Sequence, residues 1–255
     1  MYPDLFGIPG FTMNVFMILA VISAFVLAFI YLKKKGLKKE AYLDFAILLI
    51  ATIIAGLVGA ILFENIYEAI KHAINGTPQA WTWSMTFYGG LFAGVVTFLL
   101  VYFLYYVKHN PPFIKDVLVI APASIALGHA IGRIGCFFNG CCYGKETDEW
   151  YGILFPGHAH KVIPTQLFEM IFLFVLAAAL IFIAFKGITK YTFVIYMFSY
   201  SIFRFILEFF RGDERGQLAG LSPSQYWCII LFIGAFVLIY AYMKWIFPKE
   251  KKVEA

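Results

Sequence analysis

The sequence predicts an all-α, polytopic membrane protein with about seven transmembrane helices, and two observations carry this prediction. The chain of 255 residues is 62% hydrophobic and 14% charged, whereas about 25% of the residues of a typical soluble domain are charged. Its apolar residues gather in runs of about 20, the length that a helix needs to cross a bilayer. Only helices and closed barrels satisfy their backbone in lipid, and the runs lack the alternation of barrel strands, so helices are predicted.

Each predicted span is a continuous apolar run between polar loops. The spans cover residues 11–32, 41–63, 85–107, 117–135, 164–185, 191–210 and 225–247. The first run has no positively charged segment before it and no small-residue cleavage site, so we interpret it as a retained span. No internal repeat or linker is visible, and residues 1–255 are expected to form a single transmembrane domain.

Lysine and arginine placement predicts the orientation of the spans. Thirteen basic residues lie on the loops of one side and five on the other, and the remaining two of the 20, Arg133 and Arg204, lie inside spans. The N-terminus is therefore expected outside and the C-terminus in the cytoplasm. Because the basic residues are divided among short loops, the net charge of +5 indicates topology and not nucleic-acid binding.

The loops expected outside cover residues 64–84, 136–163 and 211–224. In the first of them, Ile66, Ile70 and Ile74 recur at helical spacing. This spacing predicts a short amphipathic helix on the membrane surface, with an ordered connector as the alternative.

Ionisable residues inside the spans are the first candidates for a functional site, because a charge in lipid costs free energy and needs a partner. Arg133 lies near the outer end of the fourth span. Arg204 and Glu208 are four residues apart in the sixth span, hence on one helical face. The fifth span begins with Gln166 and Glu169 close to the same membrane surface. Arginine suits phosphate oxygens, so the constellation predicts a phosphate-binding cavity, with structural helix pairing as the alternative.

Glycines accompany these charges. Tyr88-Gly-Gly90 opens the third span, and Gly128, Gly132 and Gly135 recur at spacings of four and three in the fourth. Glycines at such spacing let helices approach closely, and they also let a backbone approach a ligand.

Several blocks in order along residues 84–226 resemble the signature of the bacterial prolipoprotein diacylglyceryl transferases. They are Tyr88-Gly-Gly90, Gly132-Arg-Ile-Gly135 with Asn139-Gly140 and Gly144, Pro164-Thr-Gln-Leu-Phe-Glu169, Tyr200-Ser-Ile-Phe-Arg-Phe-Ile-Leu-Glu-Phe-Phe-Arg211, and Ser224-Gln225. A single block is weak evidence, but the set and its order are specific, and the predicted seven-helix architecture also matches the family.

The resemblance implies an inner-membrane transferase that needs no cofactor. The family moves the diacylglyceryl group of phosphatidylglycerol onto the lipobox cysteine of a secreted preprolipoprotein and releases glycerol phosphate. Arg133 matches the signature arginine that would hold the lipid phosphate, and Arg204 with Glu208 matches the second arginine and its acidic partner. The active face is expected to point outward, and the expected partners are the phospholipid and the preprotein, with no nucleic acid.

Candidate site residues follow from the resemblance and from the residue types together. His129 lies four residues before Arg133 on the same face and is the best histidine candidate for a general base. The predicted catalytic residues are Tyr88, His129, Arg204 and Glu208. The predicted substrate-binding residues are Gly89, Gly90, Arg133, Asn139, Gly144, Gln166, Tyr200 and Arg211.

The chain departs from the family pattern at several positions. Tyr88 stands where the family usually has histidine, and Cys136 and Cys141 stand where it has asparagine and glutamate. The first span also lacks the usual Tyr-Gly pair. Phosphate-holding residues are thus retained while others change, which indicates a divergent member. Two alternatives remain open: a paralogue with a different acceptor, and a non-catalytic lipid-binding or thiol-redox membrane protein.

Three of the four cysteines, Cys136, Cys141 and Cys142, lie within one predicted outer loop, and Cys228 lies in the seventh span. A disulfide from Cys136 to one of the other two is the first expectation, since the outside is oxidising. Free thiols and a zinc site completed by His129, His158 or His160 are the alternatives. The C-x4-C-C spacing is not a standard zinc pattern, so no metal is assigned.

Overall fold

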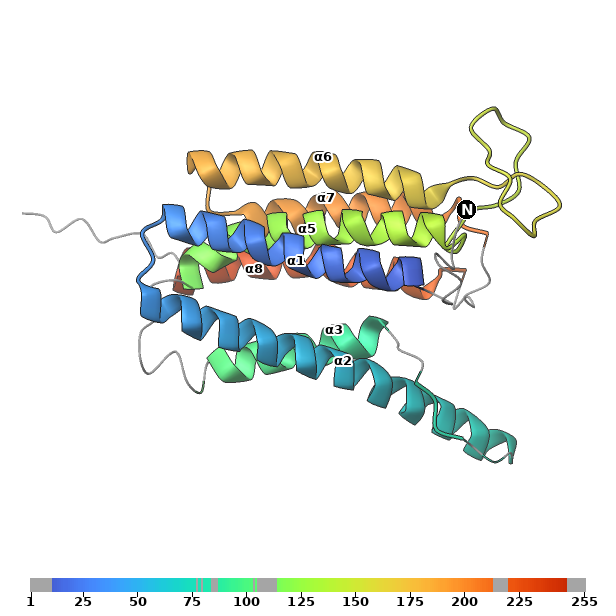
Figure 1. The fold of residues 1–255 in the computed structure, drawn as a ribbon, viewed down its shortest axis with the longest axis horizontal. Coiled ribbons are helices and arrows are strands. Elements are labelled where there is room, and N and C mark those ends of the chain that lie inside the picture. The colour runs from blue at the N-terminus through green and yellow to red at the C-terminus, as the bar shows by residue number, and fades with distance from the viewer. Residues whose placement is uncertain are drawn as a thin grey trace, which may run out of the picture. The chain divides into compact units, whose positions relative to one another are not determined.

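The computed structural model describes residues 11–76, 78, 80–83, 87–102, 104, 114–212 and 220–246, and these are helical apart from loops and isolated bridges (Figure 1). The predicted all-α class is confirmed. The helices are α1 Phe11–Lys34, α2 Lys39–Asn75, α3 Phe87–Val101, α5 Ile114–Phe138, α6 Thr165–Lys186, α7 Thr192–Glu208 and α8 Pro223–Ala241, which continues as the π-helix η3 Tyr242–Ile246.

Each predicted span overlaps one of these helices, and several of the helices extend beyond the predicted bounds. Among the described residues, five stretches are long and apolar enough to cross a bilayer: Phe11–Lys34, Tyr42–Ile70, Ile114–Phe138, Thr165–Lys186 and Pro223–Lys244. The other two helices are shorter, with 15 residues in α3 and 17 in α7. The protein is therefore a multi-pass membrane protein, and part of the predicted third span lies outside the described residues.

The structure corrects the prediction of a separate surface helix after residue 63. Residues 64–75 continue α2 without a break, and the helix ends only at Gly76, whose φ of 65° is left-handed. The physical reason is that no proline or glycine interrupts this stretch, so the helix propagates. Asn65 ties the following loop to the helix, because its Nδ2 donates to the Ile61 and Thr82 carbonyls, each at 2.8 Å.

The chain folds as two compact units, residues 36–114 and residues 1–35 with 115–255. In the unit of residues 36–114, α2 packs against α3 through glycines. A Cβ atom added at Gly89 would lie 2.9 Å from the Gly59 carbonyl oxygen, and one at Gly90 would lie 3.0 Å from that of Gly56. These glycines therefore allow the two helix backbones to approach closely.

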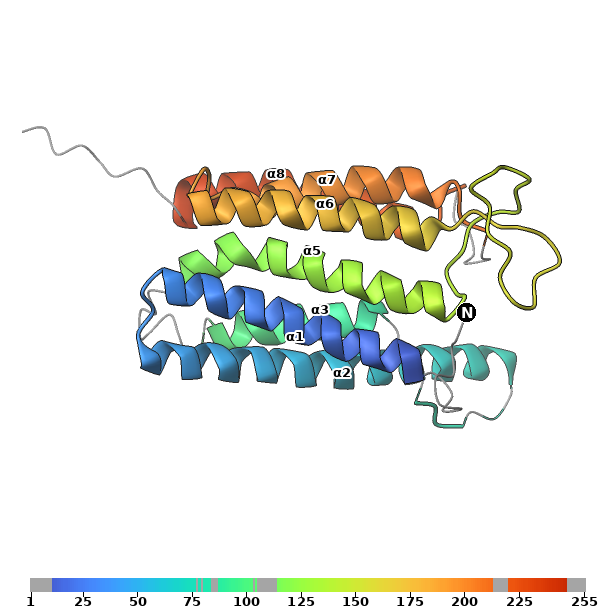
Figure 2. The same ribbon diagram turned by 45° about the horizontal axis from the view of Figure 1, so that its top comes forward.

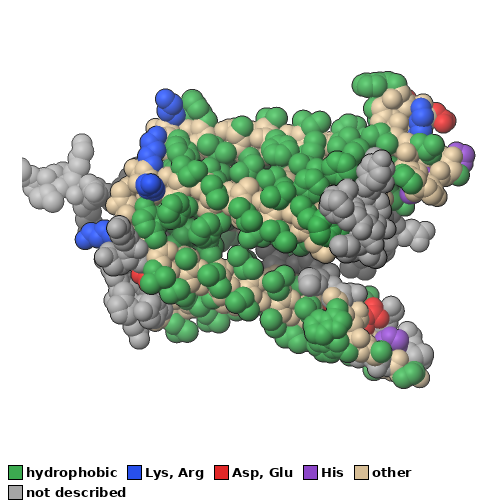
Figure 3. Space-filling model, in the orientation of Figure 1, with side chains coloured by type: hydrophobic (Ala, Val, Ile, Leu, Met, Phe, Trp, Pro, Cys, Tyr) green, Lys and Arg blue, Asp and Glu red, His purple; other side chains and the backbone are tan. Residues whose placement is uncertain are grey.

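The other unit is a bundle of α1 and α5–α8 (Figures 1 and 2). In it, α7 packs against both α6 and α8, and α1 lies along α5. α7 packs on α6 through stacked rings of Phe172 and Phe203, with centroids 3.9 Å apart. It packs on α8 through Phe198 and Phe232, with centroids 5.0 Å apart. Apolar side chains cover the visible sides of these helices (Figure 3), as expected for helices that face lipid.

Two of the three glycines in α5 position this helix against α1. A Cβ atom at Gly128 would lie 3.0 Å from the Ala20 carbonyl oxygen, and one at Gly135 would lie 3.0 Å from Met13 Sδ. A Cβ atom at Gly132, by contrast, would meet no heavy atom of the described residues outside its own stretch of helix within 4 Å. The glycine pattern therefore serves helix packing at Gly128 and Gly135, and Gly132 takes no part in the contact with α1.

The loop between α5 and α6 folds at one end of this bundle, beyond the helices (Figures 1 and 2). Isolated bridges pair Glu146 and Ile153 with Val162, and Gly144 with Arg211. The Gly144 amide donates to the Ile163 carbonyl at 2.7 Å, and a Cβ atom there would lie 2.5 Å from the Phe210 carbonyl oxygen. Only glycine fits this crossing, which fixes the loop against the start of α6 and the end of α7.

Candidate active site

A buried carboxylate, Glu169 of α6, lies at the centre of the bundle's polar residues. Its side chain is fully buried. The guanidinium of Arg133 in α5 binds it with Nη2 donating to Oε1 at 3.1 Å and Nε 3.0 Å from Oε2. On the α7 side, Nη1 of Arg204 lies 3.6 Å from Oε2. One carboxylate thus contacts arginines from two neighbouring helices.

Two further groups complete the surroundings of Glu169. The Tyr200 hydroxyl of α7 donates to Oε1 at 2.9 Å, and Nε2 of His129 in α5 lies 3.6 Å from the same oxygen. The rings of His129 and Tyr200 meet edge to face, with centroids 5.3 Å apart. α5, α6 and α7 therefore meet at this side chain, and His129 has a carboxylate that can stabilise its protonated form.

A second ion pair extends the cluster to the beginning of α8. Nη2 of Arg204 lies 2.6 Å from Oε2 of Glu208, as the spacing of four residues predicts. The Ser222 hydroxyl donates to Oε1 of Glu208 at 2.9 Å, and Ser222 also caps α8 by accepting from the Gln225 amide. The same residues that start α8 therefore hold the carboxylate of the pair.

The cluster is electrically balanced and opens on its α5 side. Arg133 and Arg204 offset Glu169 and Glu208. The Arg204 side chain is 7% exposed, whereas Arg133 is 16% and His129 26% exposed. Nη1 of Arg133 contacts the Cys136 sulfur at 3.9 Å, which is a weak acceptor for a guanidinium donor. The more exposed groups of the cluster are therefore the His129 imidazole and the Arg133 guanidinium.

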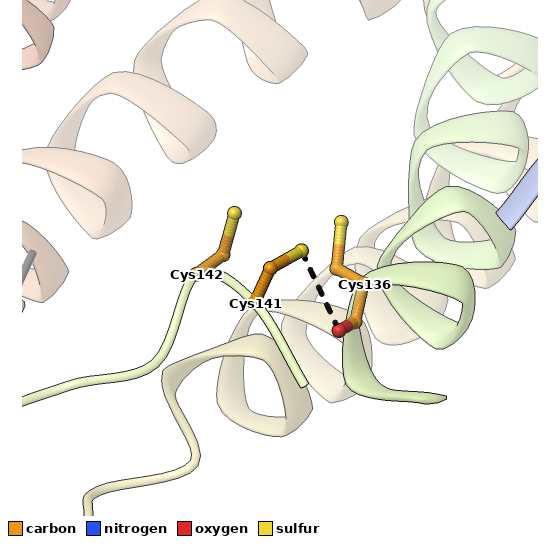
Figure 4. A group of neighbouring side chains, drawn as sticks. All are labelled: Cys136, Cys141 and Cys142. Carbon is orange, nitrogen blue, oxygen red and sulfur yellow. Dashed lines mark hydrogen bonds between the residues drawn. The ribbon is translucent and has the colours of Figure 1, made fainter. Parts of the chain in front are cut away.

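Three cysteines gather next to Arg133, at the end of α5 and in the loop that follows (Figure 4). Cys136, Cys141 and Cys142 carry reduced thiols whose sulfur atoms all lie within 4.8 Å of one another. No disulfide joins them in the structure, so the expected bond stays a prediction. Hydrogen bonds from the Cys136 and Cys141 thiols, followed by the charge of Arg211, lower the pKa of the Cys142 thiol.

Side chains at the start of α6 hold this loop in place. Gln166 donates through Nε2 to the Cys141 carbonyl at 2.7 Å, and the Thr165 hydroxyl donates to the Cys142 carbonyl at 2.8 Å. Asn139 begins the turn that leads to these cysteines, and its backbone amide donates to the Gly135 carbonyl at 2.9 Å. Of these two residues predicted to bind substrate, Gln166 thus contacts the cysteine loop and Asn139 belongs to it.

The other predicted site residues divide between the two units. His129, Arg133, Tyr200, Arg204 and Glu208 come together around Glu169. Arg211 is buried at the end of α7, where it pairs with Gly144. Gly89 and Gly90 belong to the unit of residues 36–114 and pack against α2, and the side chain of Tyr88 lies outside the described residues.

Glu169 is the residue that the sequence placed in the charged constellation but that was not among the predicted catalytic or substrate-binding residues. Its partners on α5 and α7 are more than 30 residues away in the chain, so no local spacing reveals them. Charge balance is the signal that was available: two arginines inside spans with only Glu208 beside them require a second carboxylate.

Comparison with known proteins agrees with the motifs. The family model for prolipoprotein diacylglyceryl transferase matches residues 3–241. A phosphatidylglycerol–prolipoprotein diacylglyceryl transferase of Clostridium tetani is 33% identical over 244 residues, covering 92% of this chain and 94% of that protein. The enzyme of Finegoldia magna is 30% identical over 254 residues, covering 98% of both chains. The phosphatidylglycerol–prolipoprotein diacylglyceryl transferase 2 of Clostridium perfringens is 40% identical over 137 residues, covering 51% of this chain and 52% of that protein.

These matches confirm the resemblance drawn from the motifs, and they extend it beyond the motif region to almost the whole length of the chain. The membrane-spanning helices agree with such an assignment. The chain belongs to the prolipoprotein diacylglyceryl transferase family.

Proposed function

We propose that the protein transfers the diacylglyceryl group of phosphatidylglycerol to the cysteine thiol of a secreted prolipoprotein. In this reaction a carbon–sulfur bond forms to the diacylglyceryl carbon and the bond from that carbon to the phosphate oxygen breaks. The electron pair leaves with the phosphate as glycerol phosphate, and the thiol loses its proton. The observation that carries the proposal is the membrane-embedded cluster around Glu169 in a chain of this family.

Arg133 is the proposed phosphate ligand. It is held by Glu169 on one side, and its Nη1 reaches a weak sulfur acceptor on the other. A planar guanidinium can give two parallel hydrogen bonds to phosphate oxygens, and its charge would stabilise the leaving group. Arg204 would add a second positive charge to the cluster, because it is more buried than Arg133 and also contacts Glu169.

His129 is the proposed base for the acceptor thiol. A thiolate attacks far better than a thiol, so the reaction needs a proton acceptor. His129 is the more exposed of the two α5 residues that contact Glu169, and the carboxylate would stabilise the imidazolium that forms. The remaining proposed site residues are Tyr88, Gly89, Gly90, Asn139, Gly144, Gln166, Tyr200, Glu208 and Arg211. We also propose that residues 1–255 act as one transmembrane domain.

The active face is proposed to point out of the cell. Lys33 and Lys34 end α1 and Lys186 ends α6, and Figure 3 shows basic side chains gathered at that end of these helices. The positive-inside rule favours the cytoplasm for this end. Glu169 lies in the first turns of α6, toward the opposite end. A lipobox cysteine reaching the outer face after secretion would meet the site there.

Turnover by purified protein tests this function. The protein in phosphatidylglycerol vesicles is incubated with a lipobox peptide and with a control peptide in which serine replaces the cysteine. We expect mass spectrometry to find one diacylglyceryl group on the cysteine peptide and none on the serine peptide. Tight lipid binding without any transfer would contradict the proposal and support a lipid-binding protein. Glycerol phosphate release with an unmodified peptide would support a paralogue with a different acceptor.

A further inference from the structure

The cysteine loop of this chain is built so that three sulfur atoms converge. Cys136 lies in the last turn of α5, and the chain then turns back through Gly140 and Cys142, which both have left-handed φ values of 66° and 65°. Among the described residues, Cys142 is the one non-glycine residue with positive φ. A side chain in this conformation costs free energy, so the position of Cys142 has a compensating interaction.

The backbone of the loop is held from outside the loop as well. Thr165 and Gln166 donate to the carbonyls of Cys142 and Cys141, and Gly144 fixes the segment that follows. The three sulfurs lie on one side of this backbone (Figure 4). A disulfide would use two of the three, so it leaves the convergence of the third unexplained.

A sulfur-binding metal ion with tetrahedral coordination accounts for the convergence of all three sulfur atoms. With Zn–S bonds of about 2.3 Å, the sulfurs of a tetrahedral zinc site lie about 3.8 Å apart. The sulfurs here lie within 4.8 Å of one another, so shifts of about 1 Å close the site. The Arg133 guanidinium borders this site, with its Nη1 3.9 Å from the Cys136 sulfur.

We propose that Cys136, Cys141 and Cys142 bind one Zn²⁺ ion and that its fourth position takes the acceptor thiol. No histidine or carboxylate joins the trio among the described residues, so three protein ligands leave one tetrahedral position open. A thiol that coordinates zinc loses its proton. This role rests on the proposed function: the bound thiolate sulfur attacks the diacylglyceryl carbon next to the phosphate held by Arg133, and its proton passes through water to His129.

Metal content tests the site without any turnover. The full-length protein is purified in detergent with zinc in the medium, and elemental analysis is run on the wild type and on Cys136→Ser, Cys141→Ser and Cys142→Ser. Cys228→Ser is the matched control, because this buried cysteine lies outside the trio. We expect about one zinc per chain in the wild type and control, and at least about tenfold weaker binding in the other three.

Cobalt substitution tests the open position. Thiolate ligands give Co²⁺ a strong near-ultraviolet absorption, which we expect to change with a cysteine peptide and to stay the same with its serine counterpart. A metal-free wild type that takes up neither zinc nor cobalt, or a disulfide within the trio in the purified protein, would overturn the site. An unchanged cobalt spectrum with the cysteine peptide, or full transfer activity after chelation, would overturn the role while the proposed function stands. Zinc binding without any lipid transfer would remove the proposed function and leave the site.

Discussion

At the scale of single residues, Glu169 decides how the site is held together. It is fully buried and takes the charges of Arg133 and Arg204, so its removal leaves two buried cations with Glu208 alone. Breaking a buried ion pair from one side costs about 3–5 kcal/mol. The loss is structural and catalytic at once, because the same carboxylate orients Arg133 and His129.

We therefore predict that Glu169→Gln lowers the thermal midpoint and reduces transfer at least about a hundredfold. The initial rate and a melting curve of the detergent-purified protein measure both effects. Glu149→Gln is the control, since Glu149 is exposed in the loop. Near wild-type rate and stability in Glu169→Gln would show that the cluster does not depend on this charge.

Arg133 is the residue whose role depends most on the shape of its side chain. Lysine keeps the charge but cannot contact Glu169 and a phosphate through a planar set of donors. We predict that Arg133→Lys lowers the transfer rate at least about tenfold, while Lys145→Arg at an exposed loop position leaves it unchanged. Wild-type activity in Arg133→Ala would remove Arg133 from the mechanism.

At the scale of helices, ion pairs and caps connect the elements. Arg204 binds Glu208 within α7, and Glu208 accepts from the residue that caps α8. Groups in one network affect stability non-additively. We predict an interaction energy of about 1–3 kcal/mol in a double-mutant cycle of Arg204→Ala and Glu208→Ala, measured by unfolding in detergent. Additivity within about 0.5 kcal/mol would show that the pair is not coupled.

Two glycines of α5, Gly128 and Gly132, differ in whether a neighbouring helix packs against them. A methyl group at Gly128 meets the backbone of α1 at 3.0 Å, whereas one at Gly132 meets no described atom outside its own stretch of helix within 4 Å. We predict that Gly128→Ala lowers the unfolding midpoint and that Gly132→Ala does not, because alanine also favours helix. Equal destabilisation by both changes would contradict the proposed contact of α1 with α5.

At the scale of the whole molecule, the helices were predictable because apolar length alone defines them. Arg133, Arg204 and Glu208 stood out because charge is rare in such runs, and the i, i+4 pair was visible in the sequence. The central position of Glu169 depends on how α5, α6 and α7 pack, and the continuation of α2 to Asn75 depends on the absence of a stop signal. Neither follows from local spacing. The convergence of three sulfurs needs the left-handed turn at Cys142, which its residue type does not predict.

The measurement that tests the central claim most directly is the stoichiometry of the two products in a single reaction. Labelled phosphatidylglycerol and a lipobox peptide are incubated with the wild type and with Arg133→Ala, and lipidated peptide and glycerol phosphate are both quantified. We predict equal amounts of the two products from the wild type and neither from Arg133→Ala. Glycerol phosphate in excess over lipidated peptide, or equal turnover by the two proteins, would contradict a transfer organised around this cluster.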